Sequence, residues 1–104
     1  MSILNALFGK KEEISYKDLI KQGAVVLDVR SKEEFECGHI KGAINIPLDV
    51  LPTGIKKIGD KNKLIITCCL SGGRSSAAKH ALTTLGYTNV YNGGGWNQLH
   101  TKLQ

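Results

Sequence analysis

One stretch in the middle of the chain decides the fold, and it reads Leu64-Ile65-Ile66-Thr67-Cys68-Cys69-Leu70-Ser71-Gly72-Gly73-Arg74-Ser75. Its first four residues show no polar alternation, which predicts the central strand of a parallel sheet covered on both faces. Residues 75–85, which follow the glycines, carry apolar side chains at the spacing of a helix that packs one face on that strand. The stretch therefore predicts a strand, a tight glycine loop and a helix.

The rest of the chain alternates strand and helix signals in the same way. Short apolar runs predict further strands at residues 24–28, 44–46 and 90–91. A helix is predicted to begin after Ser15, and another after Ser31, where Glu34 completes a capping box. Residues 48–58, interrupted by proline and glycine, are interpreted as helical turns and loop. This alternation predicts an α/β fold with a mainly parallel sheet and right-handed crossovers.

Length and composition indicate one globular domain. The chain has 104 residues, of which 41% are hydrophobic and 22% charged, values that are ordinary for a globular protein. Residues 1–12 are interpreted as a flexible leader and residues 13–104 as the domain. The leader lacks the basic start and the cleavage site of a signal peptide, and no apolar run is long enough to span a bilayer. A cytoplasmic protein without a membrane partner is expected.

The spacing of the cysteines and the distribution of charge limit which cofactors and ligands are expected. Three cysteines without metal-binding spacing argue against a disulfide framework and against a metal, and no cofactor is expected. The formal net charge is +5, and residues 61–104 contain five basic side chains and no acidic one. The positive electrostatic potential of these side chains favours small anions as ligands. The charges form no dense stripe with interleaved aromatic residues, so nucleic acid is not expected as a partner.

Cys69 is the candidate nucleophile. It stands where the predicted strand ends, so the glycine loop and the helix N-terminus surround its sulfur with backbone N–H groups and the positive end of a helix dipole. Together with the nearby Arg74, this setting lowers a cysteine pKa and turns a thiol into a thiolate. The sequence predicts a reactive thiolate at the carboxyl end of a parallel strand, where ligands of such sheets bind.

Three segments, in this order, carry a resemblance to a known family. They read Leu27-Asp28-Val29-Arg30 with Glu33-Glu34-Phe35, then Gly38-His39-Ile40-Lys41-Gly42-Ala43-Ile44-Asn45-Ile46-Pro47, and Cys69-Leu70-Ser71-Gly72-Gly73-Arg74-Ser75. A fourth segment runs from Gly86-Tyr87 to Trp96. On these motifs the chain resembles the rhodanese family of single-domain sulfurtransferases over nearly its whole length. The resemblance implies a rhodanese-like three-layer fold, with a mainly parallel five-stranded sheet flanked by helices.

The resemblance also implies a mechanism. Cys69 matches the family's catalytic cysteine, which takes a sulfane sulfur from thiosulfate or a related persulfide donor and holds it as a persulfide. The substrate would be bound by the loop residues, namely Leu70, Ser71, Gly72, Gly73, Arg74 and Ser75. Gly72 and Gly73 would let the backbone curl, and Arg74 would orient the anionic donor. The expected acceptors are cyanide, a thiol, or an acceptor protein such as a thioredoxin-like one.

Two other functions stay open at this point. Cys68 to Arg74 also spells C-x5-R followed by serine, which is the phosphate-binding loop of cysteine phosphatases, so a phosphatase or arsenate reductase that uses Cys68 is one alternative. The loop length and the position of Ser71-Gly72 favour Cys69. The second alternative is a sulfur-relay module that loads Cys69 but turns over small acceptors poorly.

The remaining polar residues are given structural roles. Asp28 and Arg30 are expected to form structural hydrogen bonds and to pair with Glu33 or Glu34. His39 is expected to be structural, and His80 and His100 exposed. Cys68 is interpreted as a packing residue, and Cys37 as a bystander rather than a resolving thiol.

Overall fold

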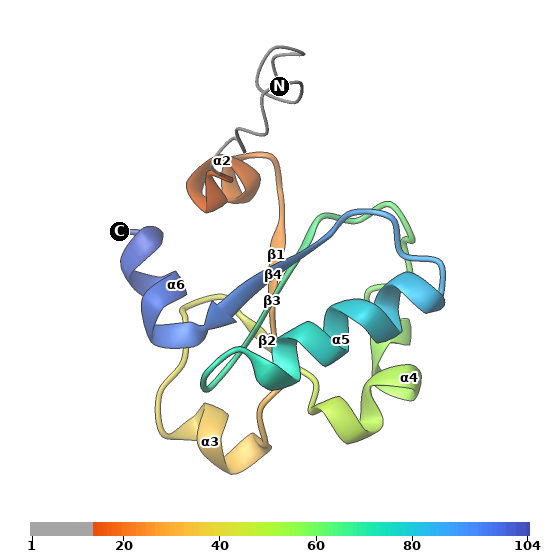
Figure 1. Ribbon diagram of the computed structural model, residues 1–104, viewed down its shortest axis with the longest axis horizontal. Coiled ribbons are helices and arrows are strands. Elements are labelled where there is room, and N and C mark those ends of the chain that lie inside the picture. Colours follow the sequence, from red (N-terminus) through yellow and green to blue (C-terminus); the bar gives the residue numbers. More distant parts are fainter. Residues whose placement is uncertain (1–13) are drawn as a thin grey trace, which may run out of the picture.

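The computed structural model describes residues 14–104, so the predicted leader lies outside the described residues. The strands are β1 (Val25–Asp28), β2 (Ile44–Asn45), β3 (Ile65–Cys69) and β4 (Val90–Gly95). They form one sheet in the order β2-β1-β3-β4, and every neighbouring pair is parallel (Figure 1). The expected parallel α/β sheet is confirmed.

The strand number differs from the five implied by the resemblance, because the sheet within residues 14–104 has four strands. The apolar residues left between β2 and β3 form helical turns instead of an extended strand. Pro47 and Pro52, which cannot donate to a strand ladder, lie in this segment.

The helices cover both faces of the sheet. They are α2 (Tyr16–Lys21), α3 (Lys32–Glu36), α4 (Leu51–Gly54), α5 (Gly73–Thr84) and α6 (Trp96–Lys102), with 3-10 turns at Leu48–Val50 and Ile55–Lys57. Leu51 of α4 and Leu82 of α5 pack in one core cluster, while Leu19 of α2 and Leu99 of α6 pack in another. The fold therefore has the expected three layers, and α3 lies beyond the carboxyl end of β1 (Figure 1).

Local capping positions the helices that precede the site. The Ser15 side chain accepts a hydrogen bond from the Asp18 N–H at the start of α2. At α3, the Ser31 hydroxyl accepts from the Glu34 N–H at 3.2 Å, and the Glu34 carboxylate accepts from the Ser31 N–H at 3.0 Å. This predicted capping box fixes Glu34 close to the carboxyl end of β1.

β3 is buried along its whole length, as predicted for a central strand. Its side chains alternate, so Cys69 joins the core cluster beneath α5 and Cys68 joins the cluster on the opposite face. Ala78 and Leu82 of α5 are fully buried, as predicted for the apolar face of this helix, whereas Leu85 at the end of that face is exposed. Within residues 14–104 no helix has the length and apolarity to cross a membrane.

Candidate active site

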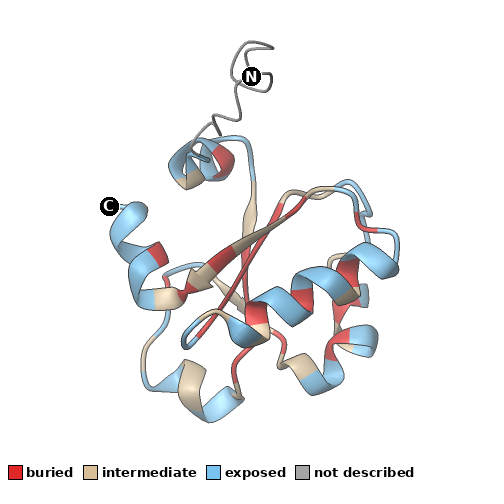
Figure 2. Ribbon diagram, in the orientation of Figure 1, coloured by how far each residue is buried: buried red, intermediate tan, exposed pale blue. Residues whose placement is uncertain are grey.

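The site lies where β3 passes through a short loop into α5. Cys69 is the last residue of β3 and is 1% exposed, whereas the loop that follows it reaches the surface (Figure 2). The Gly72 N–H donates a hydrogen bond to the Cys69 Sγ at 2.9 Å. No side chain caps the N-terminus of α5, so its first N–H groups stay available to a ligand. Leu70, the first residue of the loop, is 59% exposed.

The curl of the loop depends on one glycine rather than two. Gly72 has a φ of 109°, in the left-handed region that favours glycine. Gly73 has no positive φ, and a Cβ added there would meet no atom within 4 Å. The expectation that both glycines permit the turn therefore holds for Gly72 only.

Opposing effects set the pKa of Cys69. Burial of the sulfur raises the pKa, because it disfavours the charged thiolate. Hydrogen bonds from the Ser75 hydroxyl, and from the backbone N–H groups of Ser75, Gly72 and Ser71, lower it. The donors outweigh the burial, so the pKa of Cys69 lies below its ordinary value. The loop can stabilise a thiolate.

Cys68 has the opposite environment. Its side chain is fully buried on the other face of the sheet, and burial with the negative charge of Asp28 raises its pKa to about 12. The positive charge of Arg30 offsets part of this effect. Cys68 thus remains a thiol near neutral pH, and the geometry favours Cys69 as the nucleophile.

Asp28 and Arg30 form a buried ion pair with each other. The Arg30 Nη2 lies 2.7 Å from the Asp28 Oδ2, and the Arg30 Nε lies 2.9 Å from Oδ1. The expected pairing of these residues with the carboxylate of Glu33 or Glu34 is wrong. Arg30 donates a hydrogen bond to the backbone carbonyl of Glu34, at 3.3 Å, and not to its carboxylate. Arg30 also donates to the Gly38 carbonyl at 2.7 Å. The pair ties the end of β1 to α3.

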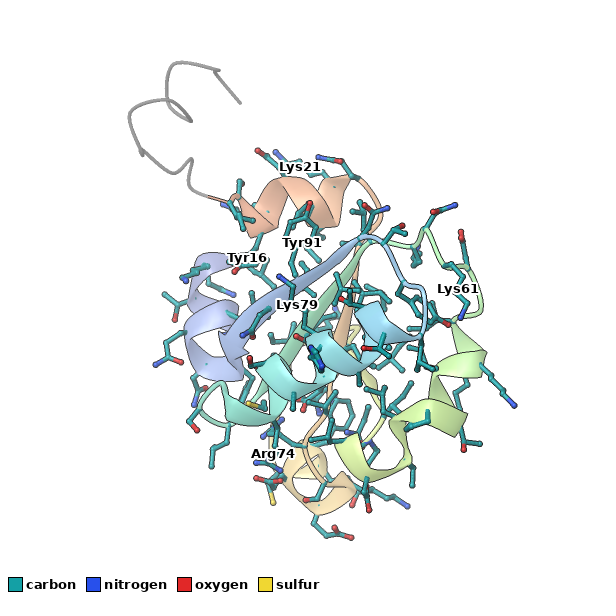
Figure 3. All side chains as sticks on the ribbon, turned by 45° about the vertical axis from the view of Figure 1, so that its right-hand side comes forward. Tyr16, Lys21, Lys61, Arg74, Lys79 and Tyr91 are labelled. Atoms are coloured by element: carbon teal, nitrogen blue, oxygen red, sulfur yellow. The ribbon has the colours of Figure 1, made fainter. Side chains whose placement is uncertain are left out.

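Arg74, in the first turn of α5, points to α3 (Figure 3). Its Nη1 and Nη2 donate to the Glu34 Oε1 and Oε2 at 2.7 and 2.9 Å. These hydrogen bonds hold the pKa of Glu34 at about 2, so its charge persists at neutral pH. The cationic half of the sequence therefore does not leave a free arginine next to Cys69, because Glu34 compensates Arg74.

Sequence reasoning missed Glu34 as the partner of Arg74, although one signal was available. Residues 61–104 contain no acidic side chain, so any carboxylate that pairs with Arg74 has to come from the first sixty residues. The capping box of α3 then restricts the choice, because it fixes Glu34 beside the end of the sheet. Only the fold brings the two segments together.

Asn92 is a second residue that sequence reasoning missed. Its Oδ1 accepts hydrogen bonds from the Ser75 hydroxyl at 2.7 Å and from the Gly94 N–H at 2.9 Å. The register of β4 against β3 shifts at this point, and a Cβ on Gly93 would lie 2.8 Å from the Thr67 carbonyl oxygen. The glycine run therefore lets β4 approach the site closely and present Asn92 to Ser75.

The other candidate residues take no part in this cradle. His39 stacks on Phe35 with ring centroids 3.7 Å apart, and its Nδ1 lies 2.7 Å from the Phe35 carbonyl oxygen. His80 and His100 are exposed. Cys37 is an exposed free cysteine at the end of α3. Among the described residues, no group of three histidine, cysteine or acidic side chains could hold a metal ion.

Comparison with known proteins identifies the family. The sequence model of the Rhodanese-like domain matches residues 14–102, and the chain belongs to this family. It is 41% identical over 70 residues to the thiosulfate sulfurtransferase PspE of Escherichia coli, an alignment that covers 66% of this chain and 67% of the relative. It is 38% identical over 85 residues to thiosulfate sulfurtransferase 16, chloroplastic, of Arabidopsis thaliana, with 70% of each protein covered.

Solved structures agree with this assignment. A structure described as a rhodanese with anions from E. coli superposes with a TM-score of 0.69 at 38% identity, over 72% of this chain and 89% of that one. The human single-domain sulfurtransferase TSTD1 has a TM-score of 0.69 at 27% identity, over 85% and 90% of the two chains. The rhodanese-like fold implied by the sequence motifs is confirmed.

Proposed function

We propose that this protein is a sulfurtransferase that moves a sulfane sulfur from thiosulfate, or from a related persulfide donor, to cyanide or a thiol through a persulfide on Cys69. The observation that carries the proposal is the environment of one sulfur. Hydrogen-bond donors from Gly72 and Ser75 lower the pKa of Cys69 despite its burial. The names of relatives such as the thiosulfate sulfurtransferase of E. coli support the same reaction.

The first half-reaction loads the sulfur. The Cys69 thiolate attacks the outer sulfur of thiosulfate, a new sulfur–sulfur bond forms, and the bond to the sulfonate sulfur breaks so that sulfite leaves with its electron pair. The total charge is conserved, because the persulfide keeps one negative charge on its outer sulfur. N–H groups of the loop and of the first turn of α5 are fixed donors for that charge.

The second half-reaction unloads the sulfur. Cyanide or a thiolate attacks the outer sulfur, the cysteine leaves as the thiolate, and the product is thiocyanate or a new persulfide. The leaving cysteine needs no proton, because the donors that lower its pKa also stabilise it as a leaving group. The site thus favours the thiolate at the start and at the end of the cycle. An acceptor protein would approach the loop from its exposed side.

Intact-mass spectrometry after incubation with thiosulfate tests the proposal. One added sulfur atom is expected on the unmodified chain and on Cys68→Ser, and none on Cys69→Ser. Subsequent addition of cyanide is expected to remove the sulfur and to release thiocyanate. A sulfur that loads but is not discharged by cyanide would indicate a relay module. The absence of sulfur on the unmodified chain would refute the proposal.

A phosphatase that uses Cys68 has less support. The nucleophile of that alternative would be a buried thiol with a pKa of about 12, on the face of the sheet away from the loop. Turnover of para-nitrophenyl phosphate is therefore not expected, and turnover that disappears in Cys68→Ser would restore this alternative.

A further inference from the structure

The pairing of Arg74 has a consequence for the charge of its ligands. Within residues 14–104, both hydrogen bonds of the Arg74 side chain go to one carboxylate, that of Glu34. The two side chains are 38% and 32% exposed, so the pair lies near the surface and not in the core. An anion that approaches Cys69 therefore meets an arginine whose charge is already compensated.

Further hydrogen bonds restrain Glu34, so it does not move with Arg74 when Arg74 binds a ligand. Its Oε1 accepts from the Ser31 N–H at 3.0 Å as well as from the Arg74 Nη1 at 2.7 Å, so the carboxylate is also anchored to the start of its own helix. Its backbone carbonyl in addition accepts from Arg30 at 3.3 Å, next to the buried ion pair. A ligand that binds Arg74 must share the guanidinium with Glu34 or displace it.

An acidic residue other than Glu34 lines a hollow beside Arg74. Arg74 lines an open hollow of about 400 Å³ at the carboxyl end of the sheet, together with Val29, Ser31, Pro47, Leu48 and Asp49. Asp49 brings a further negative charge to this wall, and no other basic residue lines it. The wall of this hollow therefore carries one acidic and one basic side chain, in contrast to the sequence half from which Arg74 comes.

We propose that Glu34 is a specificity-determining residue, whose carboxylate competes with doubly charged donors for Arg74 and so favours persulfide donors of lower charge. This inference rests on the proposed sulfurtransferase function. A dianion such as thiosulfate needs the positive charge of Arg74 most, and loses most from the competition. A neutral or singly charged persulfide can reach Cys69 with the backbone donors of the loop alone.

The test uses sulfate, a dianion of similar shape that carries no transferable sulfur. Sulfate that occupies the loop should protect Cys69 from alkylation by iodoacetamide, so the concentration needed for half-protection measures anion affinity without any turnover. The variant is Glu34→Gln, which removes the charge but keeps an amide oxygen that can accept from Ser31 in the capping box. Glu36→Gln removes the same charge from an exposed position of the same helix and is the matched control.

Half-protection is expected at about fivefold less sulfate in Glu34→Gln than in the unmodified chain, a size set by the modest strength of exposed ion pairs. Glu36→Gln should behave like the unmodified chain at constant ionic strength. The gain should vanish when Arg74→Ala is added to Glu34→Gln, because the competition acts through that guanidinium. KM for thiosulfate should fall in parallel, with kcat little changed.

Two results would overturn the inference. Unchanged protection in Glu34→Gln would mean that the carboxylate does not compete, and weaker protection would mean that Glu34 only positions Arg74 for the anion. Sulfur loading of the unmodified chain, measured separately by mass, reports on the proposed function itself. Tighter sulfate binding in Glu34→Gln without sulfur loading would leave the anion competition established and remove the sulfurtransferase.

Discussion

The two faces of the sheet at the end of β3 contain the same kinds of side chain and differ in chemistry. On one face, Cys68 lies next to the Asp28–Arg30 pair, and all three side chains are buried. Burial dominates there and raises the pKa of Cys68 to about 12. Each charge of the pair is satisfied by its neighbour, and the Arg30 guanidinium also lies 4.7 Å from the centre of the Trp96 ring.

On the other face, Cys69 lies next to the loop, within electrostatic reach of Arg74 and its partner Glu34. This sulfur is also buried, yet its pKa is lowered, because the Ser75 hydroxyl and backbone N–H groups of the loop donate hydrogen bonds to it. Burial alone therefore does not set the pKa of a cysteine. Hydrogen-bond donors aimed at the sulfur can outweigh it, and they act on Cys69 but not on Cys68.

The largest expected difference between the faces is in stability. Asp28→Asn should lower the free energy of unfolding by about 3 to 5 kcal/mol, because it leaves Arg30 charged and buried without its counter-ion. Glu34→Gln should cost much less, because its pair is half-exposed and screened by solvent. Urea denaturation followed by the fluorescence of Trp96, the single tryptophan, measures both.

The comparison between the two ion pairs would fail if the two variants lost similar stability. Urea slopes should stay equal across the variants, which would show that each transition reports the same unfolding reaction. A changed slope for Asp28→Asn would instead indicate that the folded state itself has loosened.

The second prediction concerns reactivity at neutral pH. Iodoacetamide should alkylate Cys69 at least about a hundredfold faster than Cys68, because the pKa of Cys69 lies below its ordinary value whereas that of Cys68 is about 12. Since the pKa of Cys69 is lowered, its rate should persist as the pH falls below the ordinary range of a thiol, and be lost only below that lowered pKa. Peptide mapping by mass spectrometry separates the two sites, with exposed Cys37 as an internal reference.

Much of this arrangement could be predicted from the sequence. The unbroken apolar run of β3 gave the central strand, and the capping signals at Ser15 and Ser31 gave two helix starts within one residue. The period-two alternation of a strand also predicted that Cys68 and Cys69 lie on opposite faces. These features depend on neighbours in the chain, and local patterns report them well.

Long-range pairing could not be predicted in the same way. Glu34 and Arg74 are 40 residues apart, and Ser75 and Asn92 are 17 apart, so their contacts exist only once the sheet order and register are set. The partner of Arg30 was missed for a different reason. A carboxylate two residues away on a strand end is close enough to bind the guanidinium, and Asp28 takes the place predicted for Glu33 or Glu34.

The third prediction alters the loop around Cys69 and leaves the face that contains Cys68 unchanged. Gly72→Ala should cost about 1 to 2 kcal/mol and raise the pKa of Cys69 toward its ordinary value, because an alanine at a φ of 109° is strained and the loop donor shifts. Gly73→Ala is the matched control, since a Cβ there meets no atom within 4 Å. Thiolate absorbance at 240 nm against pH gives the titration. Equal effects of the two substitutions would remove the special role of Gly72.

The smallest expected effect concerns the side-chain donor to Cys69. The Ser75 hydroxyl has a single hydrogen to donate. Its oxygen lies 2.7 Å from the Asn92 Oδ1 and 3.0 Å from the Gly72 carbonyl oxygen. The hydroxyl therefore donates to the Cys69 thiolate only part of the time. Ser75→Ala should therefore slow the alkylation of Cys69 below neutral pH by about fivefold at most, with the pKa moved upward.

Ser76→Ala, one residue further along α5 and exposed, should leave that rate unchanged. Asn92→Ala separates two explanations, because it removes one of the two competing acceptors and should let the Ser75 hydroxyl donate to the thiolate more often. A rate that rises in Asn92→Ala and falls in Ser75→Ala would show that the hydroxyl divides its hydrogen between them. A rate that falls in both would show instead that Asn92 holds Ser75 in place. The reactivity of Cys69 would then depend on β4 as much as on the loop that follows β3.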